Sequence, residues 1–395
     1  MVSKNSRDRH ISFVRSWKLT ADTIYELGQC DAFVDALSNV PINPVDRSKF
    51  LIVSLIKGAR ATTAIEGNTL SEEEIARVIE GQKLPPSKSY QENEVKNILD
   101  ALNQLMREVA LDNRAQHIDP EMIKRFHYMV GKGLGEVFEA VPGKYRTHNV
   151  HVGGVYIPPD YKDVKNLVEQ FCEWIFKEFH FESGQTFSDS ILHAIVSHVY
   201  IAWIHPFGDG NGRTARLLEF YIMVRAGNPD FASHLLSNFY NETRNEYYHH
   251  LDKSRKTGDL SEFIAYAVRG YRDGLVNLLT LVRECLFHAA WENYVHEVFR
   301  KNKASGNLGI VLKRCRDLIL AFPLRKKLTV EEIKLLNVNI AANYKVLSPR
   351  TIDRDLTRLI KLELLIKDKD RYIANSVVLS RYVPIKAPTR KKISK

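Results

Sequence analysis

The side chains best suited to chemistry lie in one stretch, residues 205–216, with the sequence HPFGDGNGRTAR. Apolar runs with helical character flank it at 191–204 and 217–224, which predicts a loop between two buried helices. Its glycines break the helix, and Gly210-Asn211-Gly212 can turn successive backbone N–H groups toward an anion. The sequence therefore predicts a phosphate site at this loop.

Charged and titratable side chains complete the candidate site. The second helix starts just after the glycines, so its positive dipole end would point at the same anion. Arg213 and Arg216 add fixed positive charge within one helical turn. Asp209 is suited to holding Mg²⁺ against phosphate oxygens, and His205 can accept a proton near neutral pH. A base, a metal ligand and a phosphate site thus lie within twelve residues.

This stretch resembles the signature of Fic-domain proteins, His-x-Phe-x-Asp/Glu-Gly-Asn-Gly-Arg-x-x-Arg, and every specified position is filled. The resemblance implies a protein adenylyltransferase, which moves AMP from ATP to a Ser, Thr or Tyr hydroxyl of a target protein and of itself. It implies that His205 deprotonates the hydroxyl and that Asp209 binds Mg²⁺. The implied ATP-binding residues of the signature are Gly210, Asn211, Gly212, Arg213 and Arg216.

A second motif precedes the signature. Residues 62–67, TTAIEG, match the Ser/Thr-x-x-x-Glu-Gly/Asn pattern of inhibitory helices in Fic proteins. Helical spacing of apolar residues from Phe50 to Ala59, followed by Gly67, places Glu66 at a helix C-terminus, where a carboxylate opposes the helix dipole unless a cation meets it. The resemblance implies that Glu66 pairs with Arg216 and keeps basal activity low.

Two further segments resemble parts of Fic proteins that contact substrates. Residues 150–159 alternate around a Gly-Gly pair and predict a hairpin. The resemblance implies a flap that binds the target's backbone as an added strand, formed by Val152, Gly153, Gly154 and Val155. The pair Tyr247-Tyr248 resembles the family's aromatic wall for adenine, with Tyr248 as an ATP contact. Arg255 stands where some relatives have a base-contacting Asn.

Length and composition are those of a globular enzyme of two or three domains. The chain has 395 residues, 44% hydrophobic and 26% charged, with a formal net charge of +10. We find no apolar h-region at the start and no apolar run approaching the ~20 residues of a membrane span, so we expect a cytoplasmic protein that does not bind membranes. The four scattered cysteines predict buried thiols rather than disulfides or zinc ligands.

The C-terminal part turns basic and predicts a separate domain. A helix opening at Leu328-Thr329, a second opening at Ser348-Pro349 with Ser348 as N-cap, and a hairpin at 364–373 resemble a winged helix-turn-helix. Its basic recognition helix would span Thr351 to Leu362. Winged helices also mediate protein contacts, so DNA binding and dimerisation or partner docking both remain open.

We therefore predict a mainly α fold: a Fic helical core with a β-hairpin flap, and a C-terminal winged helix. We also expect an irregular N-terminal arm with one or two short helices over residues 1–45 and a helix over about 274–299. The predicted domains are a helical region 1–110 with the inhibitory helix at about 48–67, the Fic core 111–283, a linker helix 284–304, the winged helix 305–384 and a basic tail 385–395.

The expected co-substrate is ATP with Mg²⁺, and the expected partner is a target protein bearing an acceptor hydroxyl. A second copy of the chain and DNA are further candidate partners. Two alternative functions remain: an ATP-sensing DNA-binding regulator, and a Fic enzyme that transfers a different phosphate-bearing group.

Overall fold

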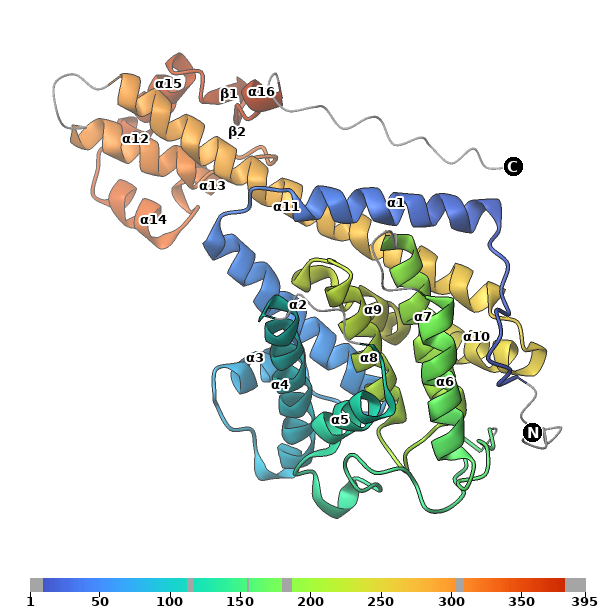
Figure 1. Ribbon diagram of the computed structural model, residues 1–395. Helices are drawn as coiled ribbons and strands as arrows, with labels where there is room; N and C mark the ends of the chain where they lie inside the picture. Colours follow the sequence, from blue (N-terminus) through green and yellow to red (C-terminus); the bar gives the residue numbers. More distant parts are fainter. Residues whose placement is uncertain (1–9, 112–116, 155, 180–186, 303–308, 381–395) are drawn as a thin grey trace. The chain divides into compact units, whose positions relative to one another are not determined.

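The computed structural model describes residues 10–111, 117–154, 156–179, 187–302 and 309–380. These ranges are mainly helical, with one two-stranded sheet, as the sequence predicts (Figure 1). The chain divides into two compact units, Met1–Thr280 and Leu281–Lys395. In the first unit the α-helices are α1 Ala21–Ser38, α2 Pro44–Ala64, α3 Glu72–Ile79, α4 Ser89–Leu111, α5 Pro120–Gly131, α6 Val164–Glu178, α7 Phe187–Ile204, α8 Asn211–Arg225, α9 Leu235–Glu242 and α10 Arg244–Thr257.

The helix α11, Ser261–Lys301, runs from the first unit into the second. The remaining elements are α12 Ile310–Leu320, α13 Val330–Lys334, α14 Val338–Lys345, α15 Arg350–Lys361, β1 Leu365–Asp368, β2 Arg371–Ala374 and α16 Val377–Ser380. Short 3₁₀ turns lie at Pro86–Lys88, Gly135–Val137 and Asp230–Ala232.

The centre of the first unit is the pair α7 and α8, which pack along each other (Figure 1). Every residue of α7 from Ser190 to Ile201 is buried. A helix that is apolar around its circumference must be covered on all sides, and α1, α6 and α8 pack against it. The loop that joins α7 to α8 is therefore held in the core at both ends.

The helix α7 is longer than the apolar run at 191–204 that we describe in the sequence. Within the described residues, α7 alone is long and apolar enough to cross a membrane, but 78% of that stretch is buried inside the protein. The central helix of a folded core passes the same test of length and composition.

The helix α2 follows the predicted pattern and brings its C-terminal end beside α8. Leu55 and Ala59 are buried on its inner face. The helix ends at Ala64, and Gly67 adopts a φ of 100° that other residues rarely take. Ser71 then opens α3 with a capping box, in which Ser71 and Glu74 bind each other's backbone N–H groups.

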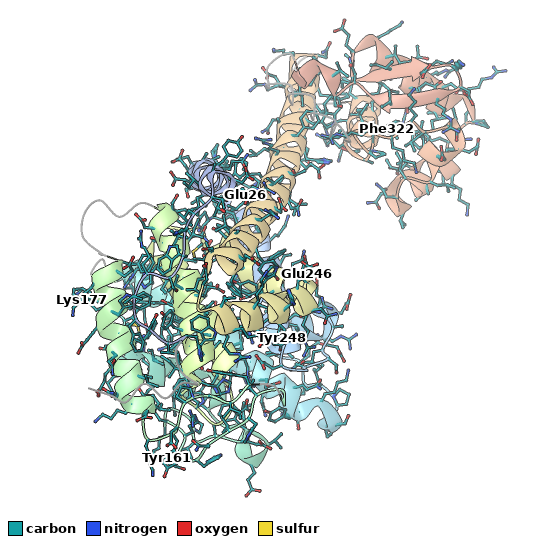
Figure 2. The ribbon with its side chains drawn as sticks, turned by 90° about the vertical axis from the view of Figure 1, so that its right-hand side faces the viewer. Glu26, Tyr161, Lys177, Glu246, Tyr248 and Phe322 are labelled. Atoms are coloured by element: carbon teal, nitrogen blue, oxygen red, sulfur yellow. The ribbon has the colours of Figure 1, made fainter. Side chains whose placement is uncertain are left out.

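The structure replaces the one or two short helices expected in an irregular arm over residues 1–45 by one long helix, α1, which occupies 18 of these residues. Thr20 caps this helix. Its buried residues include Glu26, whose carboxylate binds Arg269 and Arg272 of α11 at 3.3 and 3.1 Å (Figure 2). Its full length escaped prediction because one of its inward positions carries a charge, so the apolar spacing is interrupted.

The helix expected over 274–299 is also longer than predicted, since α11 has 41 residues. Gly270 and Gly274 obscured its first half, because glycine disfavours helix interiors. Both glycines admit side chains of α9: a Cβ at Gly270 would lie 2.1 Å from the Phe239 ring, and one at Gly274 would lie 3.2 Å from Leu235. Close packing of α9 on α11 thus outweighs their low helix propensity.

The second unit has its own core, built around Trp291 and Phe299 of α11 and the inner faces of α12 and α15. The strands β1 and β2 form an antiparallel hairpin, and a bridge between Leu328 and Tyr372 adds a short third segment to it. The N-cap of α15 is Pro349, one residue after the expected Ser348. The backbone carbonyl of Ser348 accepts a hydrogen bond from the Thr351 N–H at 2.8 Å, and among the described residues no side chain caps the helix.

The inner face of α15 also contains a buried acid that the sequence analysis missed. Asp355 is 1% exposed and accepts hydrogen bonds from Arg314 Nε at 2.6 Å, Arg314 Nη2 at 3.0 Å and Tyr344 Oη at 2.9 Å. These bonds tie α15 to α12 and α14.

We predict that Asp355→Ala lowers the free energy of unfolding of the second unit by about 3 kcal/mol, because it leaves Arg314 and Tyr344 without their anion. The exposed Asp353, on the same helix, is the matched control, and Asp353→Ala should change stability by less than about 0.5 kcal/mol. Urea unfolding combined with amide exchange of α15 measures both. Equal effects of the two substitutions would contradict the proposed tie.

Candidate functional site

The loop between α7 and α8 is clamped by one side chain. Asn211 Oδ1 accepts a hydrogen bond from Phe207 N–H, and Asn211 Nδ2 donates one to the Phe207 carbonyl, both at 2.9 Å. Phe207 is fully buried and stacks on the His127 ring with centroids 3.7 Å apart. We had predicted Asn211 as a phosphate contact, but its amide shapes the loop, and only its backbone N–H is left to face a ligand.

His205 follows α7 directly and is held by its backbone. Its φ of 49° is unusual for a residue with a side chain. The His205 carbonyl accepts a hydrogen bond at 2.9 Å from Nε of Arg146, a buried residue that also binds the carbonyls of His148 and Pro159. Burial lowers the pKa of the His205 imidazole to about 4, so its ring is neutral at neutral pH and has a free nitrogen lone pair, while the lower pKa makes it a weaker base than an exposed histidine.

We expected the backbone N–H groups of Gly210, Asn211 and Gly212 to turn together toward a phosphate. The structure arranges these three residues differently. Gly210 has a left-handed φ of 76°, but Asn211 and Gly212 are already the first residues of α8. Within the described residues, no side chain caps this helix, so its first N–H groups remain available to an anion. The helix N-terminus, rather than a turn of three successive N–H groups, is the anion-binding feature.

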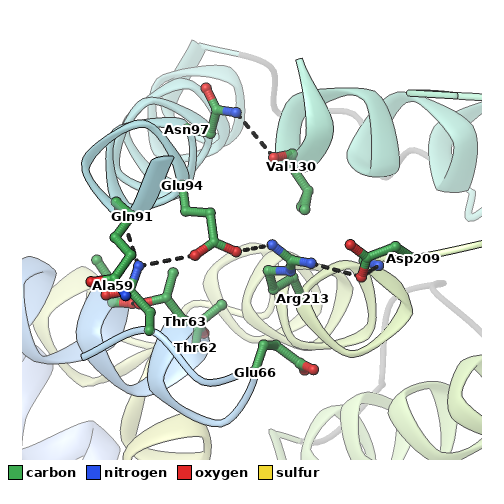
Figure 3. Close-up of polar contacts among 12 residues, drawn as sticks. Ala59, Thr62, Thr63, Glu66, Gln91, Glu94, Asn97, Val130, Asp209 and Arg213 are labelled. Carbon is green, nitrogen blue, oxygen red and sulfur yellow. Dashed lines mark hydrogen bonds and ion pairs between the residues drawn. The ribbon is translucent and has the colours of Figure 1, made fainter. Parts of the chain in front are cut away.

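A row of charges lies beneath this helix end (Figure 3). Arg213, 4% exposed, binds the Glu94 carboxylate on one side and Asp209 Oδ1 at 2.8 Å on the other. We had predicted Arg213 as a phosphate contact, but these two acids occupy it. Burial raises the pKa of Glu94. The sequence analysis does not identify Glu94 as a site residue, because its segment has the regular apolar spacing of a helix that packs on a core.

Asp209, the predicted metal ligand, keeps part of its carboxylate accessible. Its side chain is 33% exposed, and Oδ1 also accepts a hydrogen bond from the Gly210 N–H. The described residues contain no group of three or more His, Cys, Asp or Glu that could hold a metal by themselves. Asp209 fits Mg²⁺ only as a single protein ligand completed by phosphate oxygens and water, an arrangement that Mg²⁺ accepts.

The Glu66–Arg216 pair expected from the sequence is present in the structure. Arg216 Nη2 donates to Glu66 Oε1 at 2.5 Å and to the Thr62 carbonyl at 2.9 Å, and the Arg216 side chain is 1% exposed. Although burial acts to raise the pKa of Glu66, the Arg216 guanidinium lowers it below its usual value. A Cβ on Gly212 would lie 2.2 Å from Glu66 Oε1, so a larger residue at that position would displace the carboxylate from its present place.

A cavity of about 760 Å³ joins these features. Its walls include His205, Gly212, Arg216, Glu66 and Tyr248 among the predicted site residues, and the flap residues Val152 and Gly153. Gly210, Asn211, Arg213, Asp209 and Gly154 are not among the lining residues. Val155 lies outside the described residues.

The far wall of the cavity comes mainly from α10. Tyr248 is 44% exposed and faces the cavity (Figure 2), whereas Tyr247 is buried and its Oη lies 2.9 Å from His198 Nε2. Arg244 and Arg255 line the same wall. The sequence analysis gave no role to Arg244, since a lone arginine at the start of a helix carries no recognisable pattern.

The flap is shorter than a regular hairpin. Val152 and Tyr156 form an isolated antiparallel bridge around the Gly-Gly turn, with N···O distances of 2.8 and 3.0 Å. Gly153 and Gly154 have φ of 56° and 70°, which suits glycine in a tight turn. The Tyr156 ring lies under the Arg255 guanidinium at 5.2 Å, which connects the flap to α10.

Comparison with known proteins agrees with this geometry. Residues 117–223, which include the loop, α7 and most of α8, match the Fic/DOC family. The chain contains a Fic domain. Glu66 and the α10 residues of the cavity lie outside the matched range, so the cavity is formed jointly by the Fic domain and by flanking helices of the same unit.

Similar proteins carry the same domain. The chain is 29% identical over 248 residues to the protein adenylyltransferase Fic of Nematostella vectensis, covering 62% of this chain and 53% of that protein. It is 34% identical over 209 residues to the protein adenylyltransferase fic-1 of Caenorhabditis elegans, covering 53% of this chain and 38% of that protein. The chain thus spans about half or less of the length of these relatives.

Solved structures show the same fold. A Fic family protein from Desulfovibrio desulfuricans G20 aligns over 91% of this chain and 98% of its own, with a TM-score of 0.57 and 18% identity. Fic-1 from C. elegans aligns over 67% of this chain and 74% of its own, with a TM-score of 0.51 and 25% identity. The expected Fic helical fold is confirmed.

We predict that the His205 ring titrates near pH 4 rather than near 6.5, because burial disfavours its protonated form. The depressed pKa contributes stability that is present above about pH 6.5 and is lost as the pH falls toward 4. NMR titration of ring-labelled histidines, with His205→Gln to assign the signal, measures the midpoint. A midpoint near 6.5 would contradict the burial argument, and His205→Gln should flatten the loss of stability between pH 6.5 and 4.

Proposed function

We propose that this chain is a protein adenylyltransferase that moves AMP from ATP to a hydroxyl of a target protein. One observation carries the proposal: a neutral imidazole, the uncapped N-terminus of α8 and the Arg216 guanidinium converge at one cavity. The names of the related proteins from N. vectensis and C. elegans support the same activity.

The residues divide the reaction between them. The hydroxyl oxygen attacks the α-phosphorus, its proton passes to the free ring nitrogen of His205, and the bond to the β-phosphate oxygen breaks to release pyrophosphate. The N–H groups of α8 and Arg216 stabilise the charge on the phosphate chain. Asp209 would hold Mg²⁺, which supplies further charge neutralisation when bound.

Glu66 would inhibit this reaction by occupying Arg216. The guanidinium fork that would bind the outer phosphates of ATP already donates to Glu66 and to the Thr62 carbonyl. A nucleotide therefore meets a carboxylate where its own negative charge should lie, and like charges repel. The target would bind along the flap through main-chain hydrogen bonds, which tolerate varied sequences and leave the acceptor hydroxyl to be a Ser, Thr or Tyr.

We predict that Glu66→Gly raises self-labelling from α-labelled ATP about tenfold or more, because it frees the charge-assisted bonds of Arg216 for phosphate. His205→Ala in the same background should reduce labelling by about 10²–10⁴-fold through loss of the base. Glu80→Gly, a change at the C-cap of α3 away from the cavity, is the matched control and should match the wild type.

Equal labelling in all these variants would rule the scheme out. The mass of the adduct separates transfer of AMP from transfer of another phosphate-bearing group, which the relatives' names do not favour.

A second function is favoured by the distribution of charge. Residues 281–395 contain 25 Lys and Arg against 11 Asp and Glu, a net +14, whereas residues 1–280 carry 32 against 36, a net −4. A strong charge asymmetry between two parts of a chain favours a polyanionic partner for the basic part. We propose that the second unit binds duplex DNA.

The arrangement of α15 supports this partner. Arg350, Arg354, Arg358 and Lys361 recur at helical spacing and are exposed, while Ile352 faces the core. With the β1–β2 hairpin following it, α15 would serve as the recognition helix of a winged helix-turn-helix. Exposed apolar residues on and beside α14, Leu335, Val338 and Val346, make protein docking the competing outcome.

We predict that the full chain binds mixed-sequence duplex DNA and that Arg350→Gln and Arg354→Gln each weaken binding. If each arginine contacts one phosphate, the slope of log K against log salt falls by about 0.9 per substitution. Lys165→Gln on α6 removes the same charge from an exposed site in the first unit and is the control. Fluorescence anisotropy across a salt series provides the measurement, and an equal loss in all three variants would count against α15 as the interface.

A further inference from the structure

Two arginines bind the carbonyls of the last turn of α2. A helix leaves its final carbonyls without partners inside the helix, so other groups must satisfy them. Arg216 of α8 donates to the Thr62 carbonyl at 2.9 Å, and Arg244 of α10 donates to the Ile65 carbonyl at 2.6 Å. Glu66, which follows Ile65 directly, therefore sits on a turn that is held from two sides.

The Ile65 carbonyl depends on Arg244. Ile65 is 1% exposed, so its backbone is almost entirely removed from water. Besides Arg244, its other recorded contact is Tyr248 Oη at 3.5 Å, the limit of a hydrogen bond. A buried carbonyl that loses its donor is destabilised, so removal of Arg244 should loosen the turn.

Arg244 does not touch Glu66 or Arg216 through any contact that the structure records. It lies on the wall of the cavity, with its guanidinium 5.9 Å from the centroid of the Tyr248 ring. Its recorded hydrogen bond to this region ends on the backbone of residue 65, so its direct link to the Glu66–Arg216 pair is through that carbonyl. This is the behaviour of a positioning residue.

We infer that Arg244 is a positioning residue for inhibition: it holds the Ile65 carbonyl and thereby keeps the Glu66 carboxylate on Arg216. The inference rests on the proposed adenylyltransferase function for its effect on activity. The claim that Arg244 restrains residues 62–68 does not depend on that function. Loss of the restraint lets Glu66 leave Arg216 more often and raises activity.

Arg244→Met tests this inference, because it keeps the aliphatic stem and removes the donor. We expect self-labelling from α-labelled ATP to rise about tenfold, corresponding to the loss of one bond to a buried carbonyl. Amides of residues 65–68 should exchange faster in deuterium. Arg244→Lys, which retains a donor, should restore part of both effects. Lys253→Met, which removes an exposed cation from the same helix outside the cavity lining, is the control.

The Glu66→Gly background separates positioning from a direct contact with nucleotide. Arg244→Met should add nothing there, since the inhibitory carboxylate is already gone. A further rise or a fall in that background would overturn the inference, as would unchanged exchange of residues 65–68 in Arg244→Met. If Glu66→Gly itself gives no labelling, the proposed function fails, and the exchange measurement alone then decides whether Arg244 restrains the turn.

Discussion

A buried guanidinium needs an anion, and this requirement at Arg216 organises the site. The side chain is 1% exposed, so without a partner its charge would be both desolvated and uncompensated. Glu66 supplies the anion, and Gly212 leaves the space through which its carboxylate approaches. A bound polyphosphate would satisfy the same requirement. Stability of the ligand-free cavity and inhibition of the proposed reaction therefore follow from one ion pair.

Arg213 and Arg216, the two arginines of the signature, differ in how easily a ligand could replace the carboxylates that bind them. Arg213 is bound by Glu94 and Asp209, and Glu94 lies on the inner face of α4 with its side chain 7% exposed. Arg216 is bound by a residue on a turn after α2, with a side chain that is 30% exposed. A ligand can replace a carboxylate on a partly exposed turn more easily than one on the buried face of a helix. Arg213 therefore shapes the loop, and we propose that Arg216 is the arginine that binds phosphate.

The sequence predicted those parts that depend on local chemistry. Apolar spacing followed by Gly67 located α2, and the density of glycine and charge in residues 205–216 located the site. It failed where a distant contact decides the structure. Glu26 is buried because α11 supplies its arginines, and Asn211 faces inward because Phe207 offers both backbone groups. Such pairings join residues far apart in sequence or reverse a side chain's direction, so no local pattern reveals them.

The division of charge between the two units allows two anionic ligands to be kept apart. The first unit carries a net −4, so a nucleotide is drawn to its cavity by nearby groups, the α8 N-terminus and Arg216, rather than by a general field. Such local attraction reaches only about 8 Å at physiological ionic strength. The net +14 of residues 281–395 instead favours a long polyanion, and the exposed cations of α15 belong to this charge. Within the cavity Arg216 is buried and already paired with Glu66, so a nucleic acid would reach this guanidinium only by displacing the carboxylate.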